Sequence, residues 1–402
     1  MATGIEIFGD VDSRSLAQLE RCRAVERDPP AALCADHHLG YSMPIGGVVG
    51  YRQHVSPSAV GFDIACGNLA VRTPLRAADL RPDLPRIMDA IWRRISFGIG
   101  RANREVVDSP VLERVAGSPV AGQRRLLDVA REQLGTVGAG NHYVDLFEDE
   151  AGWLWVGVHF GSRGFGFKTA TGFFALAANR AFDAHVPQAG MDAPPVVLRL
   201  DTPLGQDYLA AMEIAGEYAY AGREWVVDTI VSRVLGTTVT DRVHNHHNFA
   251  WREQHGGEWL WVHRKGATPA FPGQRGFVGA TMGEPAVILR GVDHRRSRRA
   301  LYSTVHGAGR VMSRTAAAGK YKGWGAKRRQ VSRGVVDFTQ WKRRMRDLGI
   351  ELRGGAADEA PECYKRLDEV LGAHEGTIEI EHRLMPIGVA MAGPEVFDPY
   401  KD

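Results

Sequence analysis

The sequence predicts an α+β fold, a single large domain spanning residues 1–402 with mixed β-sheets in its core and helices flanking them. Three observations favour this class. Short strand-like and helix-like segments are interspersed without regular strand–helix–strand alternation. No linker rich in proline, serine or charge divides the chain. Polar, glycine-rich motifs extend from residue 36 to residue 310, so one site would gather residues from most of the chain.

The chain up to residue 232 contains two predicted strands and a long predicted helix. Segment 142–147 reads as a strand that starts at His142, and segment 153–159 reads as a strand that ends at His159. A Gly-Ser-Arg-Gly turn follows the second strand. Segment 209–232 is predicted to be helical because its apolar residues recur at roughly helical spacing.

The second half repeats this irregular mixture. Segments 259–263, 286–289 and 377–381 are predicted strands, and segment 361–371 is a predicted helix. Strands and helices that follow one another in this way favour mixed sheets over a doubly wound parallel sheet.

Composition is typical of a globular protein with a large core. The 402 residues are 44% hydrophobic and 24% charged, with a mean hydropathy of −0.23. None of the four cysteines, Cys22, Cys34, Cys66 and Cys363, belongs to a C-x-x-C pair, which favours a reducing compartment. No membrane-spanning apolar segment or signal peptide is present, so no membrane partner and a cytoplasmic location are expected.

Positive charge is concentrated near the C-terminal third, although the net charge is only +3. Segment 293–299 is basic, and the longer basic run 320–346 includes Tyr321 and Trp324. Such a run indicates either a solvated helical face or a surface for a phosphate backbone. Its position just after the motif at His306 supports the second interpretation.

Potential metal ligands lie in glycine-rich sequence at several places. They are Asp63, Cys66, His142, His159 and His247. Each alone is typical of an ordinary surface or core residue, but together they are too few for two closed structural sites and suit two adjacent, incompletely coordinated ions. A tight turn bracketed by Gly61 and Gly67 would direct Asp63 and Cys66 to one point. This donor set suits Mn²⁺, Fe²⁺, Co²⁺ or Zn²⁺ and not Mg²⁺ or Ca²⁺.

A further imidazole stands beside small residues and arginines. His306 precedes Gly307, Ala308 and Gly309, and Arg310 and Arg314 follow. Small residues leave room for an anion, and arginines hold phosphates in bidentate fashion. A histidine in this setting can be a general base, a metal ligand or a nucleophile. Segments 265–270 and 279–283 are expected to be further ligand loops, although neither is a Walker loop.

Taken in series, these motifs resemble the RtcB family of RNA-splicing ligases. The resemblance covers nearly the whole chain in the family's order. The matching segments are 36–47, 63–66, 140–142, 159–164, 247–248, 265–270, 306–310 and 358–361, together with Tyr364 and Lys365.

The resemblance implies an RtcB-like fold and an RNA ligase that uses GTP and two Mn²⁺ ions. Such enzymes join an RNA 3′-phosphate, or a 2′,3′-cyclic phosphate after opening, to a 5′-hydroxyl. The expected substrates are tRNA halves or damaged RNA, and archease is a possible accessory partner. By this resemblance Cys66 would bridge both metals, Asp63 and His142 would complete one ion, and His159 and His247 would complete the other.

The resemblance also assigns the remaining site residues. His306 would attack the α-phosphate of GTP, expel pyrophosphate and form histidine–GMP, which would activate the RNA 3′-phosphate. The residues implied at the nucleotide are Asn141, His142, Asp145, His247, Asn248, Gly279, Thr281, Met282, His306, Gly307, Ala308 and Gly309. Those implied at RNA or nucleotide phosphates are Arg163, Asn248, Arg310 and Arg314. Asp36 and His38 are expected to orient groups near the metals.

Two departures concern the guanine base. The family usually ends in Lys-Gly, where this chain has Ala392-Gly393 and a tail through Asp402, and it commonly has glutamate where Asp145 stands. A site selects its ligand by pairing buried polar groups, so the preference for GTP is left open. These departures fit a divergent bacterial-type paralogue with a narrower repair role.

Two other functions are compatible with the same residues. A binuclear phosphoesterase acting on RNA ends would use the two ions to activate water. A non-catalytic RNA-binding protein would use the basic run and keep a metal for structure.

Overall fold

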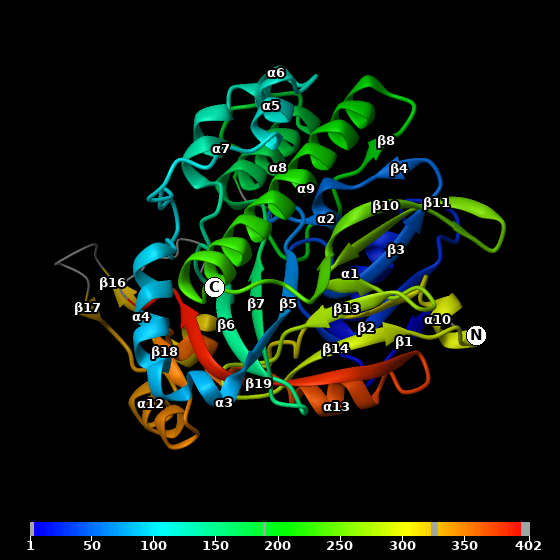
Figure 1. Cartoon of the computed structure of the whole chain (residues 1–402). Coiled ribbons are helices and arrows are strands. Elements are labelled where there is room, and N and C mark those ends of the chain that lie inside the picture. The colour runs from blue at the N-terminus through cyan, green and yellow to red at the C-terminus, as the bar shows by residue number, and fades with distance from the viewer. Residues whose placement is uncertain (1–3, 188–189, 323–328, 395–402) are drawn as a thin grey trace.

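The computed structural model describes residues 4–187, 190–322 and 329–394 (Figure 1). It confirms the predicted α+β class with mixed sheets. Most neighbouring strands pair antiparallel. In contrast, β1 (Ile5–Ile7) pairs in parallel with β2 (Ala31–His38), and β18 (Glu351–Arg353) pairs in parallel with β19 (Ile378–Met391). Trp324, Lys327 and Arg328 of the basic run, and the tail beyond Pro394, lie outside the described residues.

Two sheets dominate the structure, and their strands come from distant parts of the sequence. The five-stranded sheet runs in the order β1, β2, β3 (Ile45–Tyr51), β11 (Glu258–Lys265) and β10 (Asn248–His255). The eight-stranded sheet runs in the order β13 (Arg275–Val278), β14 (Ala286–Gly291), β19, β6 (Tyr143–Glu148), β7 (Trp153–Phe160), β5 (Gly67–Arg76) and β9 (Asp241–His246), with β18 paired to β19.

Three short strand pairs complete the β-structure of the described residues. They are β12 (Ala267–Pro269) with β15 (Ser303–Val305), β4 (His54–Val55) with β8 (Leu198–Arg199), and β16 (Tyr321–Lys322) with β17 (Arg329–Gln330).

The helices flank the sheets, as Figure 1 shows. They are α1 (Ser13–Arg23), α2 (Pro57–Val60), α3 (Ala77–Leu80), α4 (Leu84–Arg94), α5 (Val111–Ala116), α6 (Ala121–Arg124), α7 (Leu127–Gln133), α8 (Arg163–Ala177), α9 (Pro203–Thr229), α10 (Arg295–Arg299), α11 (Arg314–Ala318), α12 (Phe338–Asp347) and α13 (Leu367–Gly372). Short turns of other helix types lie at Arg81–Asp83, Ile230–Val234, Ala357–Glu359 and Pro361–Cys363.

The central strands of the eight-stranded sheet are buried on both faces. On one face, Val156 and Val158 of β7 pack in the same cluster as Val226 of α9. On the other face, Trp155 packs with Trp341 of α12. A strand that is apolar on both faces does not show a simple alternation of polar and apolar residues. The burial of these strands gives the neighbouring strand ends a rigid support.

The predicted elements are mostly confirmed, with longer bounds. The helix expected at 209–232 begins at Pro203, behind an N-cap in which Thr202 Oγ1 accepts from Gly205 N. The strand expected at 377–381 continues to Met391. The added part of β19, residues 384–391, is apolar in sequence and mostly buried.

The helix predicted at 361–371 is wrong in its first half. Pro361–Cys363 form a short 3₁₀ turn, and the α-helix begins only at Leu367. Tyr364 is extended and forms a β-bridge with Arg310. This tertiary pairing holds the chain out of the helical conformation that the sequence pattern favours.

The segment 265–270 is a second correction. It was expected to be a ligand loop, but Lys265 ends β11 and residues 267–269 form β12, which pairs with β15. Only Gly266 of this segment lines the cavity described below, whereas Gly279, Ala280, Thr281 and Met282 of the second expected loop all line it.

The described part of the basic run includes one amphipathic helix. Trp341 and Met345 of α12 are buried, and Lys342, Arg343 and Arg344 are exposed. This arrangement is typical of a solvated helical face. None of the helices in the described part of the chain combines the length and the apolar character needed to cross a lipid bilayer.

Candidate functional site

The five predicted metal ligands lie at one edge of the eight-stranded sheet. Cys66 directly precedes β5 and His142 directly precedes β6, whereas His159 is near the end of β7 and His247 follows β9. These four strands are neighbours and pair antiparallel in the order β6, β7, β5, β9. The starts of β5 and β6 therefore meet the ends of β7 and β9.

Asp63 enters the same site through the turn before β5. Cys66 N donates to Asp63 O at 3.1 Å, and Ala65 has φ of 57°, so the predicted tight turn is confirmed. A Cβ atom at Gly161 would stand only 2.3 Å from Asp63 Oδ1. Glycine at this position leaves the space that the carboxylate occupies.

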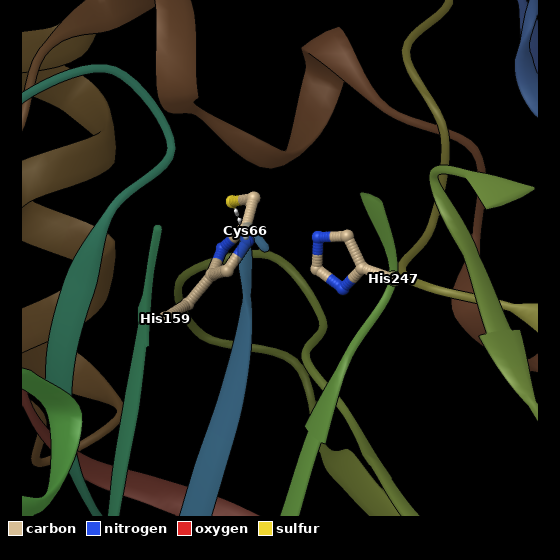
Figure 2. Close-up of side chains that lie close together, drawn as sticks. All are labelled: Cys66, His159 and His247. Atoms are coloured by element: carbon tan, nitrogen blue, oxygen red, sulfur yellow. Dashed lines mark hydrogen bonds between the residues drawn. The ribbon is translucent and has the colours of Figure 1, made fainter. Parts of the chain in front are cut away.

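The side chains form two groups that could each hold a metal ion. One group is Cys66, His159 and His247, and the other is Asp63, Cys66 and His142. The candidate ligand atoms within each group lie within 4.8 Å of one another. Figure 2 shows the first group, with the Cys66 thiol and the two imidazoles facing a common space. Cys66 belongs to both groups, as expected for a sulfur between two ions.

Individual distances show how close the donors are. Cys66 Sγ lies 3.3 Å from His159 Nε2 and 3.6 Å from His142 Nε2. His142 Nε2 lies 3.1 Å from Asp63 Oδ2. The His159 and His247 rings are 5.2 Å apart between centroids, and the His247 and His306 rings are 4.8 Å apart. The imidazoles thus form a continuous row from the turn to His306.

Burial sets the protonation of these groups. It lowers the pKa of His159 and His247 well below the usual value, which keeps both rings neutral and able to donate a lone pair. Burial raises the pKa of the Cys66 thiol, so a nearby cation is needed to hold the thiolate. Burial tends to raise the pKa of Asp63, but the hydrogen bond to His142 and the attraction of His142 and Arg163 together outweigh burial, so the pKa is lowered.

The outer ring nitrogens fix two of the imidazoles. His159 Nδ1 lies 3.1 Å from Asn141 O, and His142 Nδ1 lies 3.0 Å from Val137 O. A proton on His159 Nδ1 satisfies the Asn141 carbonyl and leaves Nε2 free as a ligand. His247 Nδ1 is buried and has no hydrogen-bond partner among the described residues. A buried nitrogen without a partner fits a metal-binding site.

His306 lies at the other side of the site, directly after β15. Asp36 is fully buried, and its Oδ2 accepts from His306 Nδ1 at 2.6 Å, from His306 N at 2.9 Å and from Gly307 N at 3.3 Å. His38 Nδ1 lies 3.1 Å from the backbone oxygen of Asp36. Asp36 was expected to orient groups near the metals, and the side chain it orients is His306.

A cavity of about 270 Å³ brings most of the predicted site residues together. Its lining includes His38, Asp63, Cys66, Asn141, His142, Asp145, His159, His247, Asn248, Gly279, Thr281, Met282, His306, Gly307, Ala308, Gly309, Arg310 and Arg314. Arg163 does not line it. Its Nη1 lies 3.0 Å from His142 Nδ1, behind the ring. Asp36 is also outside the lining and acts through His306.

The two arginines of the cavity are held by acidic and phenolic partners. Arg310 Nη1 donates to Tyr364 Oη at 2.8 Å, and Arg314 Nη1 donates to Asp358 Oδ2 at 3.0 Å and also to Glu359. These contacts fix the orientation of both guanidinium planes. Glu359 and Tyr364 also line the cavity. Both belong to segments that carried the resemblance, but neither was assigned a role from the sequence.

Asp145 is unusual because it is a buried carboxyl in the cavity wall. Its side chain is on β6, its residue is 7% exposed, and its Oδ1 has no hydrogen-bond partner in the described part of the chain. Burial raises the pKa of Asp145 well above the usual range. The carboxyl group can therefore form a hydrogen bond with a polar ligand in the cavity.

Arg223 is a site residue that the sequence did not reveal. It lies on α9, is fully buried, and its Nη1 donates to Ala65 O at 2.9 Å and to Phe160 O at 2.7 Å. Its Nε lies 2.9 Å from His244 Nε2. These bonds join the turn before β5 to the end of β7. The available signal was an arginine within the otherwise apolar repeat of the helix.

Comparison with known proteins adds an independent finding. The model of the family described as tRNA-splicing ligase RtcB matches residues 18–125 and 114–392. The chain is 30% identical to the tRNA-splicing ligase RtcB of Archaeoglobus fulgidus, over 94% of this chain and 93% of the relative. It is 31% identical to the RNA-splicing ligase RtcB of Escherichia coli K12, over 89% and 88%. It is 32% identical to the RNA-splicing ligase RtcB of Mycobacterium bovis, over 88% and 94%.

Proposed function

The chain belongs to the tRNA-splicing ligase RtcB family, and we propose that it joins an RNA 3′-phosphate or 2′,3′-cyclic phosphate end to a 5′-hydroxyl end, using GTP and two Mn²⁺ ions. The observation that supports this proposal best is the shared position of Cys66 in two ligand groups, with His306 next to one of them. The substrates would be tRNA halves or broken RNA.

The donor set fits two adjacent manganese ions. Asp63, Cys66 and His142 would hold one ion, and Cys66, His159 and His247 would hold the other. Three protein ligands for each ion leave coordination positions for phosphate oxygens. When bound, the ions supply positive charge that neutralises the attacked phosphate and orients in-line displacement.

His306 is the proposed nucleophile. Because Asp36 engages Nδ1, the lone pair for attack is on Nε2. Nε2 forms a bond to the α-phosphorus of GTP while pyrophosphate leaves with the electrons of the broken P–O bond. The Asp36 carboxylate balances the positive charge that develops on the imidazole. The product is histidine–GMP.

Two further displacements complete the reaction. An oxygen of the RNA 3′-phosphate attacks the phosphorus of histidine–GMP, and the P–N bond breaks. The 5′-hydroxyl then attacks the activated 3′-phosphate, loses its proton and releases GMP. Arg310 and Arg314, already fixed by Asp358, Glu359 and Tyr364, would contact the phosphates. Asn248, Asn141 and the 279–282 segment would contact the nucleotide.

Base choice is proposed to depend on Asp145. Its unpartnered buried oxygen suits the N–H edge of a guanine base. Ala392, which is buried just after β19, offers no charge where the family usually has lysine. We therefore expect this chain to discriminate GTP from ATP less strictly than an enzyme with both charged partners would.

The direct test is an end-joining assay with defined RNA. A 5′-hydroxyl RNA with a labelled 3′-phosphate end is incubated with Mn²⁺ and either GTP, ATP or no nucleotide, with and without archease. The proposal predicts joined product that requires both Mn²⁺ and nucleotide. Opening of a cyclic phosphate, or release of phosphate, without nucleotide would instead indicate the binuclear phosphoesterase. Salt-dependent RNA binding without any turnover would indicate the non-catalytic protein.

A further inference from the structure

A second, larger cavity adjoins the metal site. It has a volume of about 970 Å³ and lies between α8, the segments 182–187 and 194–197, and the residues that follow β2. Gly61 and Phe62 line this cleft, and Asp63, the next residue, lines the first cavity. The cleft therefore touches the same turn that brings Asp63 into the first cavity.

We propose that this cleft binds a nucleotide of the RNA strand close to the end being joined, with its base stacked on an aromatic wall. The inference rests on the proposed function, because it takes RNA as the substrate. It adds a binding site outside the cavity that contains His306 and the ligand groups.

The aromatic wall consists of four rings that are only partly buried. They are Tyr41, Phe62, Phe167 and Phe174. The Phe62 ring stacks on Phe167 at 5.6 Å between centroids and meets Phe174 edge-on at 5.3 Å and Tyr41 edge-on at 6.1 Å. Phe167 and Phe174 lie on one face of α8, at a spacing of i and i+7. Partly exposed rings of this kind are the stacking surfaces of single-stranded nucleic-acid sites.

A buried ammonium group lies among these apolar residues. Lys265 is 6% exposed, and its Nζ donates to Tyr41 O at 2.6 Å and to Ser58 O at 3.3 Å. A lysine has three N–H donors, so these bonds leave one for an acceptor in the cleft. Burial lowers the pKa of Lys265 to about 8, which still leaves the ammonium mostly charged at neutral pH. A base carbonyl or a phosphate oxygen would satisfy the remaining donor.

The charge of the cleft suits an anionic ligand. Arg125 and Lys168 are exposed at its edge, and Lys265 is within it. Of the described residues that line the cleft, Asp183 is the only carboxylate. This excess of positive charge, together with the stacking wall and the adjacent metal site, favours an RNA strand over an apolar peptide.

The walls of the cleft are held in place by specific packing. Cβ atoms at Gly122 and Gly172 would stand 2.2 and 2.4 Å from the Phe182 ring, so both glycines make room for this ring between α6 and α8. Ser58 Oγ accepts from Val196 N at 2.9 Å, and Ser56 Oγ donates to Val196 O at 2.7 Å. Both walls of the cleft are thus held in place, one by the packing around Phe182 and the other by the hydrogen bonds to Val196.

The test measures RNA affinity in variants of the aromatic wall. Phe167→Ala and Phe174→Ala are compared with Trp259→Ala, an exposed aromatic residue on β11 that does not line the cleft. Affinity for a single-stranded RNA with a 3′-phosphate is measured by fluorescence anisotropy. Loss of one stacking contact should weaken binding at least about fivefold in each wall variant. Trp259→Ala should bind like the wild type.

Two readouts separate this inference from the proposed function. Formation of histidine–GMP without RNA reports on the first cavity, and its retention in Phe167→Ala shows that the variant is folded. If the wild type forms no adduct, the proposed function fails, but the affinity comparison still decides whether the cleft binds RNA. Unchanged RNA affinity in both folded wall variants would overturn the inference.

Photo-crosslinking of the wild type tests the same site without any substitution. An RNA with 4-thiouridine in each of its last three positions is irradiated in the complex, and the crosslinked peptides are identified by mass spectrometry. Crosslinks to peptides that contain Tyr41, Phe62 or Phe167 support the cleft. Crosslinks confined to the basic run 320–346, or a partner protein that protects the cleft while RNA does not, would contradict it.

Discussion

The Asp36 carboxylate combines complete burial with a retained charge. Burial alone would raise its pKa, but the attraction of His306 and the hydrogen bonds from His306 outweigh that effect, so the pKa is lowered. A charged Asp36 accepts from His306 Nδ1 and from two backbone N–H groups. The imidazole is therefore fixed in both its orientation and its tautomer.

Replacement of Asp36 by asparagine tests this positioning role. The amide oxygen can still accept the backbone N–H groups, but the charge is lost. We expect Asp36→Asn to slow histidine–GMP formation by about 10²- to 10⁴-fold. Metal content should stay unchanged because Asp36 belongs to neither ligand group. The measurement is the single-turnover rate of adduct formation, with metal content by mass spectrometry.

The matched control is Asp201→Asn, which removes an exposed carboxylate that pairs with Arg199. It should react like the wild type. An Asp36→Asn protein with a wild-type rate would show that His306 does not depend on this carboxylate.

The site residues that could be predicted are those whose neighbours in the sequence indicate a ligand. Cys66, His142, His159 and His247 stand beside glycines or strand ends, so their grouping could be predicted once the segments were considered together. For Arg223 the sequence offered only an arginine in an apolar helical repeat, because its partners Ala65 and Phe160 are distant in sequence. The partners of Arg314 are likewise defined by tertiary structure.

At the scale of elements, the site depends on the register of β5 between β7 and β9. Gly67 pairs with Phe160 on one side and with His246 on the other. A Cβ atom at Gly67 would stand 2.4 Å from Asn245 O and 2.5 Å from His246 Cα. Only glycine allows β9 to approach closely enough for His247 to reach Cys66.

Gly67→Ala should therefore push β9 away from β5 and so separate His247 from Cys66. The added methyl meets backbone atoms, which cannot rotate away, so we expect a loss of about 1–3 kcal/mol in the free energy of unfolding. Mn²⁺ affinity should fall as well, because His247 moves away from Cys66. Urea denaturation of metal-free protein and calorimetric titration with Mn²⁺ measure the two effects.

Gly372→Ala is the matched control, since nothing lies within 4 Å of a Cβ atom at the end of α13. Its free energy of unfolding should change by no more than about 0.5 kcal/mol. Equal stability and equal Mn²⁺ affinity in Gly67→Ala and the control would show that β9 can shift without harm to the site.

Helix and strand prediction failed where another element imposed the conformation. The sequence of 361–371 favours a helix, but the pairing of Tyr364 with Arg310 holds Tyr364 extended and delays the α-helix to Leu367. That pairing also brings Tyr364 into the cavity of His306. The strand at 153–159 was predictable because its β-branched and aromatic residues and the following turn agree with its buried position.

For the molecule as a whole, several neutral histidines are buried in the core. Burial lowers the pKa of His263 to about 4 and that of His374 to about 3. In the unfolded chain these groups titrate near the ordinary value of about 6.5. Between these values the unfolded state binds more protons than the folded state. Their contribution to stability is present above about pH 6.5 and is lost as the pH falls toward 4 and then 3.

This linkage predicts that the free energy of unfolding decreases as the pH falls below about 6.5, before most carboxylates become protonated. Each such histidine contributes a slope of up to about 1.4 kcal/mol per pH unit between pH 6.5 and its folded pKa. In His374→Leu the free energy of unfolding should depend less steeply on pH than in the wild type. The difference should equal the contribution of a single histidine. It should also be less stable at pH 7, because the N–H group of Ala35 loses its acceptor.

Urea midpoints of metal-free protein between pH 7 and pH 4.5 measure this slope, and other titrating groups cancel in the difference between the two proteins. Parallel pH dependences for the wild type and His374→Leu would mean that His374 does not stay neutral in the folded state.

The whole-molecule class was predictable from the mixture of short elements, whereas the order of the strands was not. Neighbours such as β3 and β11, or β5 and β9, are separated by long stretches of the chain, and no local pattern specifies such pairing. The second cavity beside Phe62 was also beyond sequence reasoning, because its lining comes from segments scattered between Tyr41 and Lys265.

The central claim is that His306 takes a nucleotide covalently beside a paired metal site. The most direct measurement incubates the protein with Mn²⁺ and α-labelled GTP, and then maps the labelled peptide. The account predicts an acid-labile, alkali-stable adduct on His306 that is absent from His306→Ala. Label that persists in His306→Ala, or that maps to another residue, would contradict it.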